Sequence, residues 1–334
     1  MSALPAMMTC IEITKYGGPE VLVPATRPVP RPKAGEILIK VAATAVNRPD
    51  IAQRMGNYAP PPGASDLPGL EAAGTVAELG DGVSGWTVGD EICALTPGGS
   101  YAEYCTVPAP QCLPPPKGFD LLHAAALPEN YFTVWHNLFE RGQLKAGETL
   151  LVLGASGGVG LAAVELGKML GARVIACAST TEKLEVCKRA GADDTINYET
   201  ENLREAIKRL TQDRGLDVVY DPVGDKFADP AVRGLAWGGR YLVVGFAAGE
   251  IPKVALNLPL LKGGAIVGVW WGGLIKNDPA QARRLTQELV NLIADGRLKP
   301  LISATYPLAK TGDALADLMA RKVTGKIVVV TGDA

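Results

Sequence analysis

The sequence predicts an α/β protein in which a Rossmann-type, doubly wound parallel sheet is joined to a second, β-rich domain. Residues 149–180 contain, in order, an apolar strand, a glycine-rich turn, an amphipathic helix and a second apolar strand. From about residue 129 onward strands and helices alternate, which is typical of a parallel sheet with helical crossovers. Residues 9–128 instead contain short apolar runs separated by Pro and Gly, which indicates a β-rich domain.

The glycine-rich turn carries a dinucleotide fingerprint. Such a fingerprint needs a small residue for the tight turn, a glycine where the backbone meets the pyrophosphate, and another where helix and strand pack closely. Ala155, Gly157 and Gly160 hold these places. A helix that begins near Gly158 would direct its unpaired N–H groups at the diphosphate. We therefore expect the whole turn to bind a cofactor, through Ala155, Ser156, Gly157, Gly158, Val159 and Gly160.

The end of the second strand of this unit favours NADPH over NADH. A carboxylate there usually binds the ribose hydroxyls of NAD, but residues 178–180 are Ala-Ser-Thr. Hydroxyl groups and nearby cations accept a 2′-phosphate, which an acid would repel. Ser179, Lys183 and Tyr198 are the candidates for this contact. The alternative for Lys183 is a solvated charge on a helix surface.

Further strand-like runs complete the domain organisation. Four of them follow the first βαβ unit, at residues 194–198, 217–224, 240–246 and 265–271. After Gly273 come a helix at 278–296, a strand at 302–308, a helix at 311–322 and a strand at 325–330. These are too many elements for one sheet, so we expect the C-terminal segment to return to the β-rich domain. The predicted domains are 129–272 for the nucleotide, and 1–128 with 273–334 for the β-rich domain.

Composition excludes several classes of function. The chain has 334 residues and a net charge of −2, without a basic run for nucleic acid. It has neither a signal-like N-terminus nor a long enough apolar stretch for a membrane helix, which indicates a soluble, cytoplasmic protein. Its six cysteines form no C-x-x-C pair, so we expect reduced, structural thiols.

Several motifs in fixed order resemble a known family along nearly the whole chain. They are KYGGPEVL at 15–22, VNRPDIAQRMGNY at 46–58, PGLEAAGTV at 68–76, GGSYAEY at 98–104, KAGETLLVLGASGGVG at 145–160, DVVYDPVG at 217–224 and GKIVVV at 325–330. The sequence resembles the zinc-free, zeta-crystallin-like quinone oxidoreductases of the medium-chain dehydrogenase/reductase superfamily. Residues 47–65 are most similar to the p53-inducible type. The resemblance implies a GroES-like β-rich catalytic domain, with the active site in the cleft between the domains.

The same resemblance allows zinc to be tested residue by residue, because the superfamily contains zinc alcohol dehydrogenases. Catalytic zinc needs three protein ligands. Asn47, Leu70 and Glu129 stand where those enzymes have a cysteine, a histidine, and a cysteine or acid. One possible ligand cannot hold zinc, so no metal is expected. His123 and His136 lie in apolar helical surroundings and are interpreted as satisfied core or interdomain histidines.

Without a metal, hydride can still be delivered from a reduced nicotinamide to an electron-poor acceptor such as a quinone or a conjugated carbonyl. Asn47 could donate to the acceptor's carbonyl oxygen, and Tyr58 could donate a hydrogen bond or a proton. The resemblance places both beside the nicotinamide or the substrate. The alternatives are a turn asparagine and a half-buried loop tyrosine. Asp50 is interpreted as a helix cap.

The resemblance also implies further cofactor contacts by position. Thr133 corresponds to a threonine beside the nicotinamide, and two groups of residues are expected to end the fifth and sixth strands, where ligands of open α/β sheets bind. These groups are Gly245, Phe246 and Ala247, and Val269, Trp270 and Trp271. Either tryptophan could instead pack across a dimer. Arg321 resembles an arginine near the 2′-phosphate, and a cation at a helix end is the simpler explanation.

The sequence therefore predicts a zinc-free, NADPH-dependent quinone reductase that forms a homodimer. A reductase of enones, alkenals or other conjugated carbonyls is the alternative enzyme, with the same cofactor site. A non-catalytic NADPH-binding protein is the alternative outside enzymology.

Overall fold

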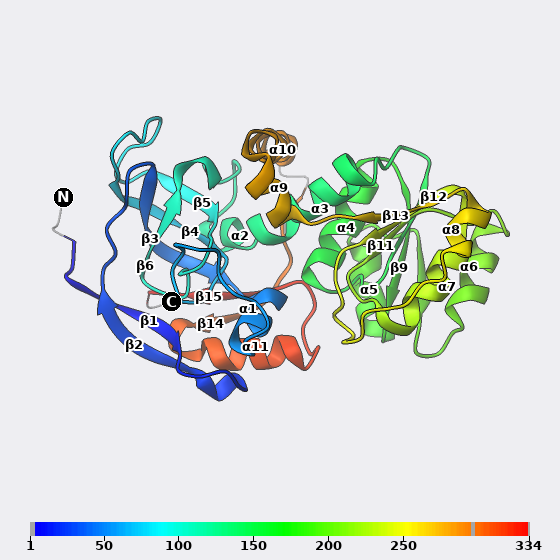
Figure 1. The fold of residues 1–334 in the computed structure, drawn as a ribbon, viewed down its shortest axis with the longest axis horizontal. Helices are drawn as coiled ribbons and strands as arrows, with labels where there is room; N and C mark the ends of the chain where they lie inside the picture. Colours follow the sequence, from blue (N-terminus) through cyan, green and yellow to red (C-terminus); the bar gives the residue numbers. More distant parts are fainter. Residues whose placement is uncertain (1–3, 295–297, 333–334) are drawn as a thin grey trace. The chain divides into compact units, whose positions relative to one another are not determined.

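The computed structural model describes residues 4–294 and 298–332, which form two compact units. Residues 130–285 form the nucleotide unit, whereas residues up to 129 and from 286 onward form the β-rich unit (Figure 1). The chain thus returns to the β-rich unit from residue 286 onward, whereas residues 273–285 belong to the nucleotide unit. Residues 1–3 of the N-terminal extension and the predicted end of the helix at 295–296 lie outside the described residues.

The nucleotide unit is built on a six-stranded parallel sheet. Its strands, in spatial order, are β10 (Asp194–Asn197), β9 (Arg173–Ala178), β8 (Thr149–Val152), β11 (Leu216–Asp221), β12 (Leu235–Val243) and β13 (Ala265–Gly268). The order changes direction at β8, because β9 lies on one side of it and β11 on the other. The glycine-rich turn that follows β8 therefore lies at a switch point, where open α/β sheets bind their ligands.

Helices cover both faces of this sheet. They are α4 (Gly158–Met169), α5 (Thr181–Arg189), α6 (Leu203–Thr211), α7 (Ala228–Arg233) and α8 (Asn257–Lys262). Leu151 and Ile175 point into the core that α6 and α7 form. The adjacent Leu150 and Val174 meet Gly167 of α4 on the other face. This alternation is what a strand buried on both faces requires.

Irregular helical turns occupy residues 128–141, at and after the residue at which the two units divide. A π-helical turn, η3 (Pro128–Phe132), leads into α3 (Thr133–Trp135) and a second π-helical turn, η4 (His136–Arg141). After β13 come α9 (Trp271–Asn277) and α10 (Pro279–Ile293), and α10 runs through the residue at which the units divide. π-helical turns are rare and occur frequently at functional sites.

The β-rich unit contains a seven-stranded sheet and a two-stranded one. The smaller sheet pairs β1 (Met7–Ile13) with β2 (Leu22–Pro28). The larger one runs in the order β14 (Ile302–Pro307), β15 (Lys326–Val330), β3 (Glu36–Ala45), β4 (Glu71–Leu79), β5 (Glu91–Leu95) and β7 (Cys112–Leu113), with β6 (Tyr104–Pro108) also paired to β3. Its helices are α1 (Arg48–Arg54), α2 (Leu121–Ala125) and α11 (Thr311–Met319). The C-terminal strands β14 and β15 thus complete a sheet that the N-terminal strands begin.

The predicted fold class is confirmed by these two sheets, but two strand ends were placed wrongly. The fifth strand of the nucleotide sheet ends at Val243, before residues 245–247, and the sixth ends at Gly268, before residues 269–271. Trp271 instead begins α9. Aromatic and β-branched residues favour strands in isolation, and here the helix that follows overrides this preference.

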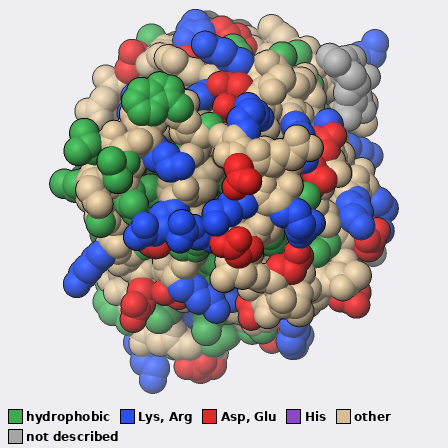
Figure 2. Space-filling model, turned by 90° about the vertical axis from the view of Figure 1, so that its right-hand side faces the viewer, with side chains coloured by type: hydrophobic (Ala, Val, Ile, Leu, Met, Phe, Trp, Pro, Cys, Tyr) green, Lys and Arg blue, Asp and Glu red, His purple; other side chains and the backbone are tan. Residues whose placement is uncertain are grey.

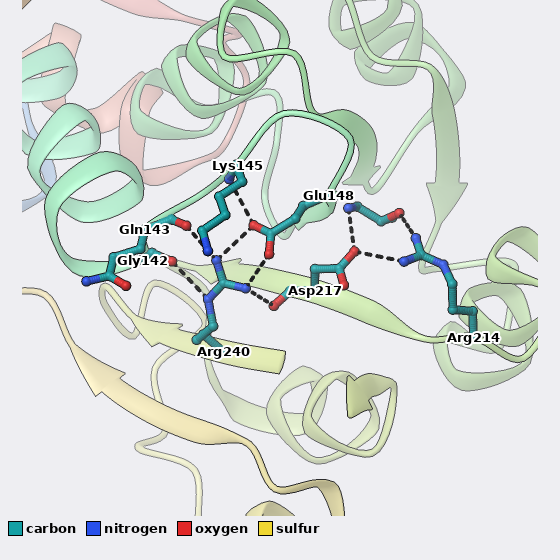
Figure 3. A network of polar contacts seen from close by, with 8 residues as sticks. Gly142, Gln143, Lys145, Glu148, Arg214, Asp217 and Arg240 are labelled. Carbon is teal, nitrogen blue, oxygen red and sulfur yellow. Dashed lines mark hydrogen bonds and ion pairs between the residues drawn. The ribbon is translucent and has the colours of Figure 1, made fainter. Parts of the chain in front are cut away.

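A network of charged and polar groups joins β12 to the amino ends of β8 and β11 in the nucleotide unit (Figure 3). Arg240 of β12 forms a bidentate pair with Glu148, with both N–O distances 2.8 Å. The remaining guanidinium hydrogens go to backbone carbonyls of Gly142, Gln143 and Asp217. We call Arg240, Glu148 and these carbonyls the Arg240 network. Burial alone would raise the pKa of Glu148, but the hydrogen bonds from Arg240 hold it below its ordinary value.

Charges of both signs are mixed on the face shown in Figure 2, and hydrophobic side chains gather near one margin of it. None of the helices within residues 4–294 and 298–332 has both the length and the apolar content needed to cross a membrane. The six cysteines all belong to the described part of the chain, are buried and form no disulfide.

Candidate active site

The glycine-rich turn has the geometry of a phosphate cradle. Gly154 adopts a left-handed conformation, with φ of 60°, directly after β8. Ala155 is buried, and its N–H donates to the carbonyl of Cys177 on β9. Gly157 is the N-cap of α4 and has no side chain that could cap the helix. The first-turn amides of this helix therefore have no side chain as an acceptor. Amides of this kind can donate to a bound anion such as a phosphate.

Two glycines of the turn differ in how much room the protein leaves around them. A Cβ on Gly160 would lie 2.3 Å from the carbonyl oxygen of Gly154 and 2.7 Å from Cα of Ala155, so helix and turn pack too closely for any side chain. A Cβ on Gly157 would meet only that same oxygen, at an ordinary 3.5 Å. The packing of the protein leaves room for a side chain at Gly157. The pyrophosphate of a dinucleotide could approach the backbone closely in the open space beside Gly157. The turn therefore fits such a ligand.

The three residues predicted to select NADPH come together at the carboxyl ends of two paired strands. Asn197 at the end of β10 is in register with Ala178 at the end of β9, so Tyr198 and Ser179 follow neighbouring strands. The Nζ atom of Lys183, on α5, lies 3.5 Å from Oγ of Ser179. All three residues are partly buried. The arrangement combines one cation and two hydroxyl groups without a carboxylate at the strand end.

The other residues predicted to contact the cofactor in the nucleotide unit lie in the segments that come after its strands, not within the strands. The amide of Gly245 donates to the carbonyl of Asp221 at the end of β11, the amide of Ala247 donates to the carbonyl of Pro222, and Phe246 is 39% exposed. Thr133 begins α3 between the two π-helical turns and is partly buried.

The residues after β13 differ sharply in exposure. Val269 and Trp271 are buried, whereas Trp270 is 73% exposed. The Trp271 ring packs against His136 with a centroid distance of 5.5 Å. Nδ1 of His136 has no hydrogen-bond partner among the described residues, so the prediction that this histidine is satisfied is wrong for that atom. Burial, and after it the charge of Arg141, lower the pKa of His136 to about 4, so the ring is neutral near pH 7. His123 instead pairs with Asp120 at 2.6 Å.

In the β-rich unit, Asn47 lies at the centre of a buried polar cluster. Its Oδ1 accepts from Nζ of Lys326 at 2.7 Å, and its Nδ2 donates to Oε1 of Glu71 at 2.8 Å and to the carbonyl of Ala45 at 3.3 Å. Lys326 and Glu71 form an ion pair at 2.6 Å, with side chains 4% and 0% exposed. Both amide hydrogens of Asn47 are thus engaged. A substrate carbonyl would compete for the longer contact, the one to Ala45.

Two further carboxyl groups belong to this cluster. Asp50 accepts from the amide of Asn47 at 2.7 Å, which confirms its predicted role as a helix cap, and from the phenol of Tyr101 at 2.6 Å. The amide of Glu129 donates to Oε2 of Glu71 at 2.8 Å. We call Asn47, Asp50, Glu71, Glu129 and Lys326 the Asn47 cluster.

The Asn47 cluster contains three carboxyl groups and one cation. Burial raises the pKa of Asp50 to about 7, despite the hydrogen bonds that Tyr101 and Asn47 donate to it. Loss of hydration, followed by the charge of Glu71, raises the pKa of Glu129 to about 8. The cluster therefore holds protons on carboxyl groups near neutral pH.

The remaining predicted residues of the β-rich unit are Tyr58 and Arg321. Tyr58 is 40% exposed in the loop after α1. Partial burial raises its pKa, and the charges of Glu129 and Asp50 raise it further. Arg321 follows α11 with φ of 55°. Burial lowers the pKa of Arg48, and the charge of Arg321 lowers it further.

Sequence reasoning missed Glu71 and Lys326, and it considered Glu129 only as a metal ligand. A signal was present: each of the first two opens a strand and is followed directly by small or apolar residues, in EAAG and KIVVV. Charged residues are almost never fully buried without a partner, and the two have opposite charges. Their pairing could not be read from the sequence, since it depends on the order β15, β3, β4 in the sheet.

The residues at the positions of the zinc ligands do not fit a zinc ion. They provide one amide, one aliphatic side chain and one carboxyl, whereas zinc binds thiolate, imidazole and carboxylate. Oδ1 of Asn47 already accepts from an ammonium group. Within residues 4–294 and 298–332, no three His, Cys, Asp or Glu side chains are placed to hold a metal.

A Rossmann unit with a dinucleotide turn, joined to a β-rich unit that carries buried polar groups, defines a nucleotide-dependent dehydrogenase of the medium-chain type. Residues 33–117 match the family described as alcohol dehydrogenase GroES-like domain, and residues 158–289 match the one described as zinc-binding dehydrogenase.

Named relatives narrow this class. The chain is 35% identical over 299 residues to the quinone oxidoreductase-like protein 2 homolog of Nematostella vectensis. The matched region covers 89% of this chain and 82% of that protein. It is 33% identical to the quinone oxidoreductase of Rattus norvegicus, over 94% of both chains. The structure of Escherichia coli quinone oxidoreductase complexed with NADPH matches with a TM-score of 0.89 and 30% identity, over 97% of this chain and 100% of that one.

The chain belongs to the quinone oxidoreductase family of medium-chain dehydrogenases/reductases, and it is an oxidoreductase of that family. This confirms the resemblance seen in the sequence. The prediction of NADPH as the cofactor is confirmed at the level of the family, in which NADPH complexes occur.

Proposed function

We propose that the chain reduces a quinone at the expense of NADPH, without zinc. The observation that carries the zinc-independent part is the ammonium group of Lys326, 2.7 Å from Asn47 and 2.6 Å from Glu71. A buried positive charge already stands beside the residue at the position of a zinc ligand. A metal cation there would meet repulsion at short range. Metal analysis of the purified protein should find no stoichiometric zinc, and one zinc per chain would contradict the proposal.

The nucleotide unit would hold the cofactor through the uncapped start of α4 and the trio of Ser179, Lys183 and Tyr198. Bound NADPH supplies a hydride. Thr133, residues 245–247, residues 269 and 271 and Arg321 complete the proposed contacts. In the β-rich unit, Asn47 and Tyr58 would donate to the carbonyl oxygen of the acceptor, where negative charge develops. The names of the relatives support a quinone as that acceptor.

An acceptor panel tests the proposed reaction. NADPH oxidation is measured with 1,2- and 1,4-quinones and, in parallel, with 2-alkenals and enones. Turnover with quinones supports the proposal. Turnover with enones alone would replace it by a conjugated-carbonyl reductase. Tight NADPH binding without any turnover would indicate a non-catalytic NADPH-binding protein.

Cofactor choice is tested by Lys183→Met, with Lys188→Met as the matched control on the same helix, where Lys188 pairs with Glu185. Loss of a charged hydrogen bond to the 2′-phosphate should weaken NADPH binding about 10- to 100-fold. NADH binding should change little, because NADH lacks that phosphate. Tyr198→Phe should act in the same direction with a smaller effect. Equal losses for both cofactors would contradict the assignment.

We also propose that the chain is a homodimer formed at the free edge of β13. Within the described residues, β13 pairs with β12 on one side only. Large apolar side chains on and near this strand are exposed: Trp237, Leu260, Leu261, Ile266 and Trp270. An edge strand with exposed apolar neighbours is a typical template for association. Ile266→Lys should convert the dimer into a monomer in light scattering, and a wild-type monomer at micromolar concentration would contradict the proposal.

A further inference from the structure

The irregular helical segment of residues 131–141 is bonded to two other parts of the nucleotide unit. At its start, the phenol of Tyr131 donates at 2.5 Å to Oε2 of Glu165 on α4, the helix that follows the glycine-rich turn. At its end, Nε of Arg141 donates at 3.2 Å to the carbonyl of Gly268, the last residue of β13. The segment therefore connects the dinucleotide helix to the chain that follows β13.

Asn137 lies within this segment, in the π-helical turn η4, and its side chain is completely buried. With its nitrogen turned toward them, its side-chain amide donates to the carbonyl of Thr133 at 3.0 Å and to that of Val269 at 2.9 Å. Hydrogen bonding requires this orientation, because a carbonyl oxygen can only accept. One side chain thus joins its own helical turn to the residue directly after β13, and both of its amide hydrogens are engaged.

The neighbours of Asn137 strengthen this connection. The ring of His136 packs against the ring of Trp271, and both side chains are buried. Together with the bond from Arg141, contacts therefore reach residues 268, 269 and 271 from a single helical turn. A functional site is precise when packing and hydrogen bonds fix the groups that form it. The turn η4 has the contacts to fix the chain after β13 in this way.

We propose that Asn137 is a positioning residue for the nicotinamide half of the cofactor, because it holds Thr133 and Val269 in a fixed relation to each other. The inference rests on the proposed function, in which both of these residues contact bound NADPH. Asn137 acts through the two backbone carbonyls that it holds. The adenine half would be held elsewhere, by the start of α4 and the residues that follow β9 and β10.

The first experiment separates the two halves of the cofactor. Asn137→Leu nearly keeps the volume of the side chain but cannot donate. It should lower kcat for quinone reduction by about 10- to 100-fold, because hydride transfer depends steeply on the placement of the ring. Adenosine 2′,5′-bisphosphate carries only the adenine half of NADPH and should bind with unchanged affinity. Wild-type kcat in the variant, or an equal loss of kcat and of this affinity, would overturn the proposal.

A second readout does not depend on turnover. A reduced nicotinamide that a protein holds in place has a longer fluorescence lifetime than one that moves freely in water. At saturating NADPH, the lifetime should be shorter in Asn137→Leu than in the wild type. Equal lifetimes would contradict the proposal, and so would a wild type in which the lifetime is that of free NADPH.

Asn137→Ser separates the two hydrogen bonds and replaces Asn137→Leu if that variant does not fold. A serine hydroxyl can donate to a carbonyl four residues earlier in a helix, here that of Thr133. It is too short to reach Val269 as well. Asn137→Ser should therefore lower kcat and shorten the lifetime as Asn137→Leu does. Wild-type values in Asn137→Ser would show that the bond to Val269 positions nothing.

Thr211→Val is the matched control in the same unit. Thr211 is buried on α6, and its hydroxyl donates at 2.8 Å to the carbonyl of Ile207, four residues earlier. The control should lower the midpoint of urea denaturation, because it removes a buried hydrogen bond. It should leave kcat and the fluorescence lifetime unchanged. Losses equal to those of Asn137→Leu would mean that any such defect in the unit has this effect, which would overturn the specific role of Asn137.

The inference and the proposed function fail separately. A wild type that reduces no quinone would overturn the proposed function, while the lifetime of bound NADPH still tests Asn137. A wild type that reduces quinones, with the same kcat and lifetime in Asn137→Leu, would overturn the role of Asn137 alone.

Discussion

The Arg240 network lies in the nucleotide unit and the Asn47 cluster in the β-rich unit, and the two are built on opposite principles. In the Arg240 network one guanidinium meets one carboxylate, every guanidinium N–H has an acceptor, and the pKa of Glu148 is lowered. In the Asn47 cluster one ammonium serves three carboxyl groups, and the pKa values of two of them are raised. The balanced charges of the Arg240 network hold neighbouring strands together. The Asn47 cluster has more carboxyl groups than cations, and its surplus carboxyl groups retain their protons.

The largest predicted effect is the loss of the buried cation. Lys326→Met should lower the free energy of unfolding by about 3–5 kcal/mol, because Glu71 would remain buried and charged without its partner. Urea denaturation measures the change. The double variant Lys326→Met/Glu71→Gln should recover much of the loss, since it also removes the charge. A loss below about 1 kcal/mol in the single variant would mean that the pair does not hold the unit together.

A smaller loss is expected from the balanced network. Arg240→Met should cost about 1–3 kcal/mol, because Glu148 and three carbonyls would lose their donors. The side chains of Arg240 and Glu148 are 19% and 21% exposed, so water can replace part of the interaction. The same denaturation experiment applies. A loss larger than that of Lys326→Met would reverse the comparison between the networks.

The two networks should also respond to pH in opposite directions. The pKa of Glu129 is raised in the folded state from its ordinary 4.5 to about 8, so the folded state binds a proton that the unfolded state releases. Its contribution to stability is complete below pH 4.5 and is lost as the pH rises through about 8. The slope is at most about 1.4 kcal/mol per pH unit.

Glu148 has the reverse dependence, because its pKa is lowered. Its contribution is present above pH 4.5 and is lost as the pH falls below that value. Unfolding free energies measured between pH 3 and 9 should therefore flatten on the alkaline side in Glu129→Gln and on the acid side in Glu148→Gln. Asp50 shares the sign of Glu129, so some alkaline slope should remain. Identical changes in both variants would refute the contrast.

The smallest effect is expected at the margin of the Arg240 network. Arg214 pairs with Asp217 at 3.2 Å, but its side chain is 55% exposed. Exposed ion pairs contribute little, so Arg214→Met should change the free energy of unfolding by less than about 1 kcal/mol. A loss equal to that of Arg240→Met would indicate that the two arginines act as one unit through Asp217, to which both of them donate (Figure 3).

The two regions also differ in how far the sequence predicts them. The nucleotide turn was predicted in detail because its requirements are local: Gly157 and Gly160 act on atoms within six residues of themselves. The Asn47 cluster was predicted only at Asn47 and Asp50. Lys326 and Glu71 are separated by 255 positions and meet through the register of two strand pairs, β15 with β3 and β3 with β4. No local sequence pattern encodes a contact between two residues so far apart in the chain.

The place of Lys326 in the chain has a consequence for synthesis on the ribosome. Residues 130–285 are complete long before the last strand emerges, so the nucleotide unit has all the sequence it needs to fold first. The β-rich unit must wait, because β3 lacks its neighbour β15 and Glu71 lacks its cation until the end of translation. A nascent chain stalled before residue 326 would therefore present an incomplete sheet to chaperones and proteases, while its nucleotide unit is already folded.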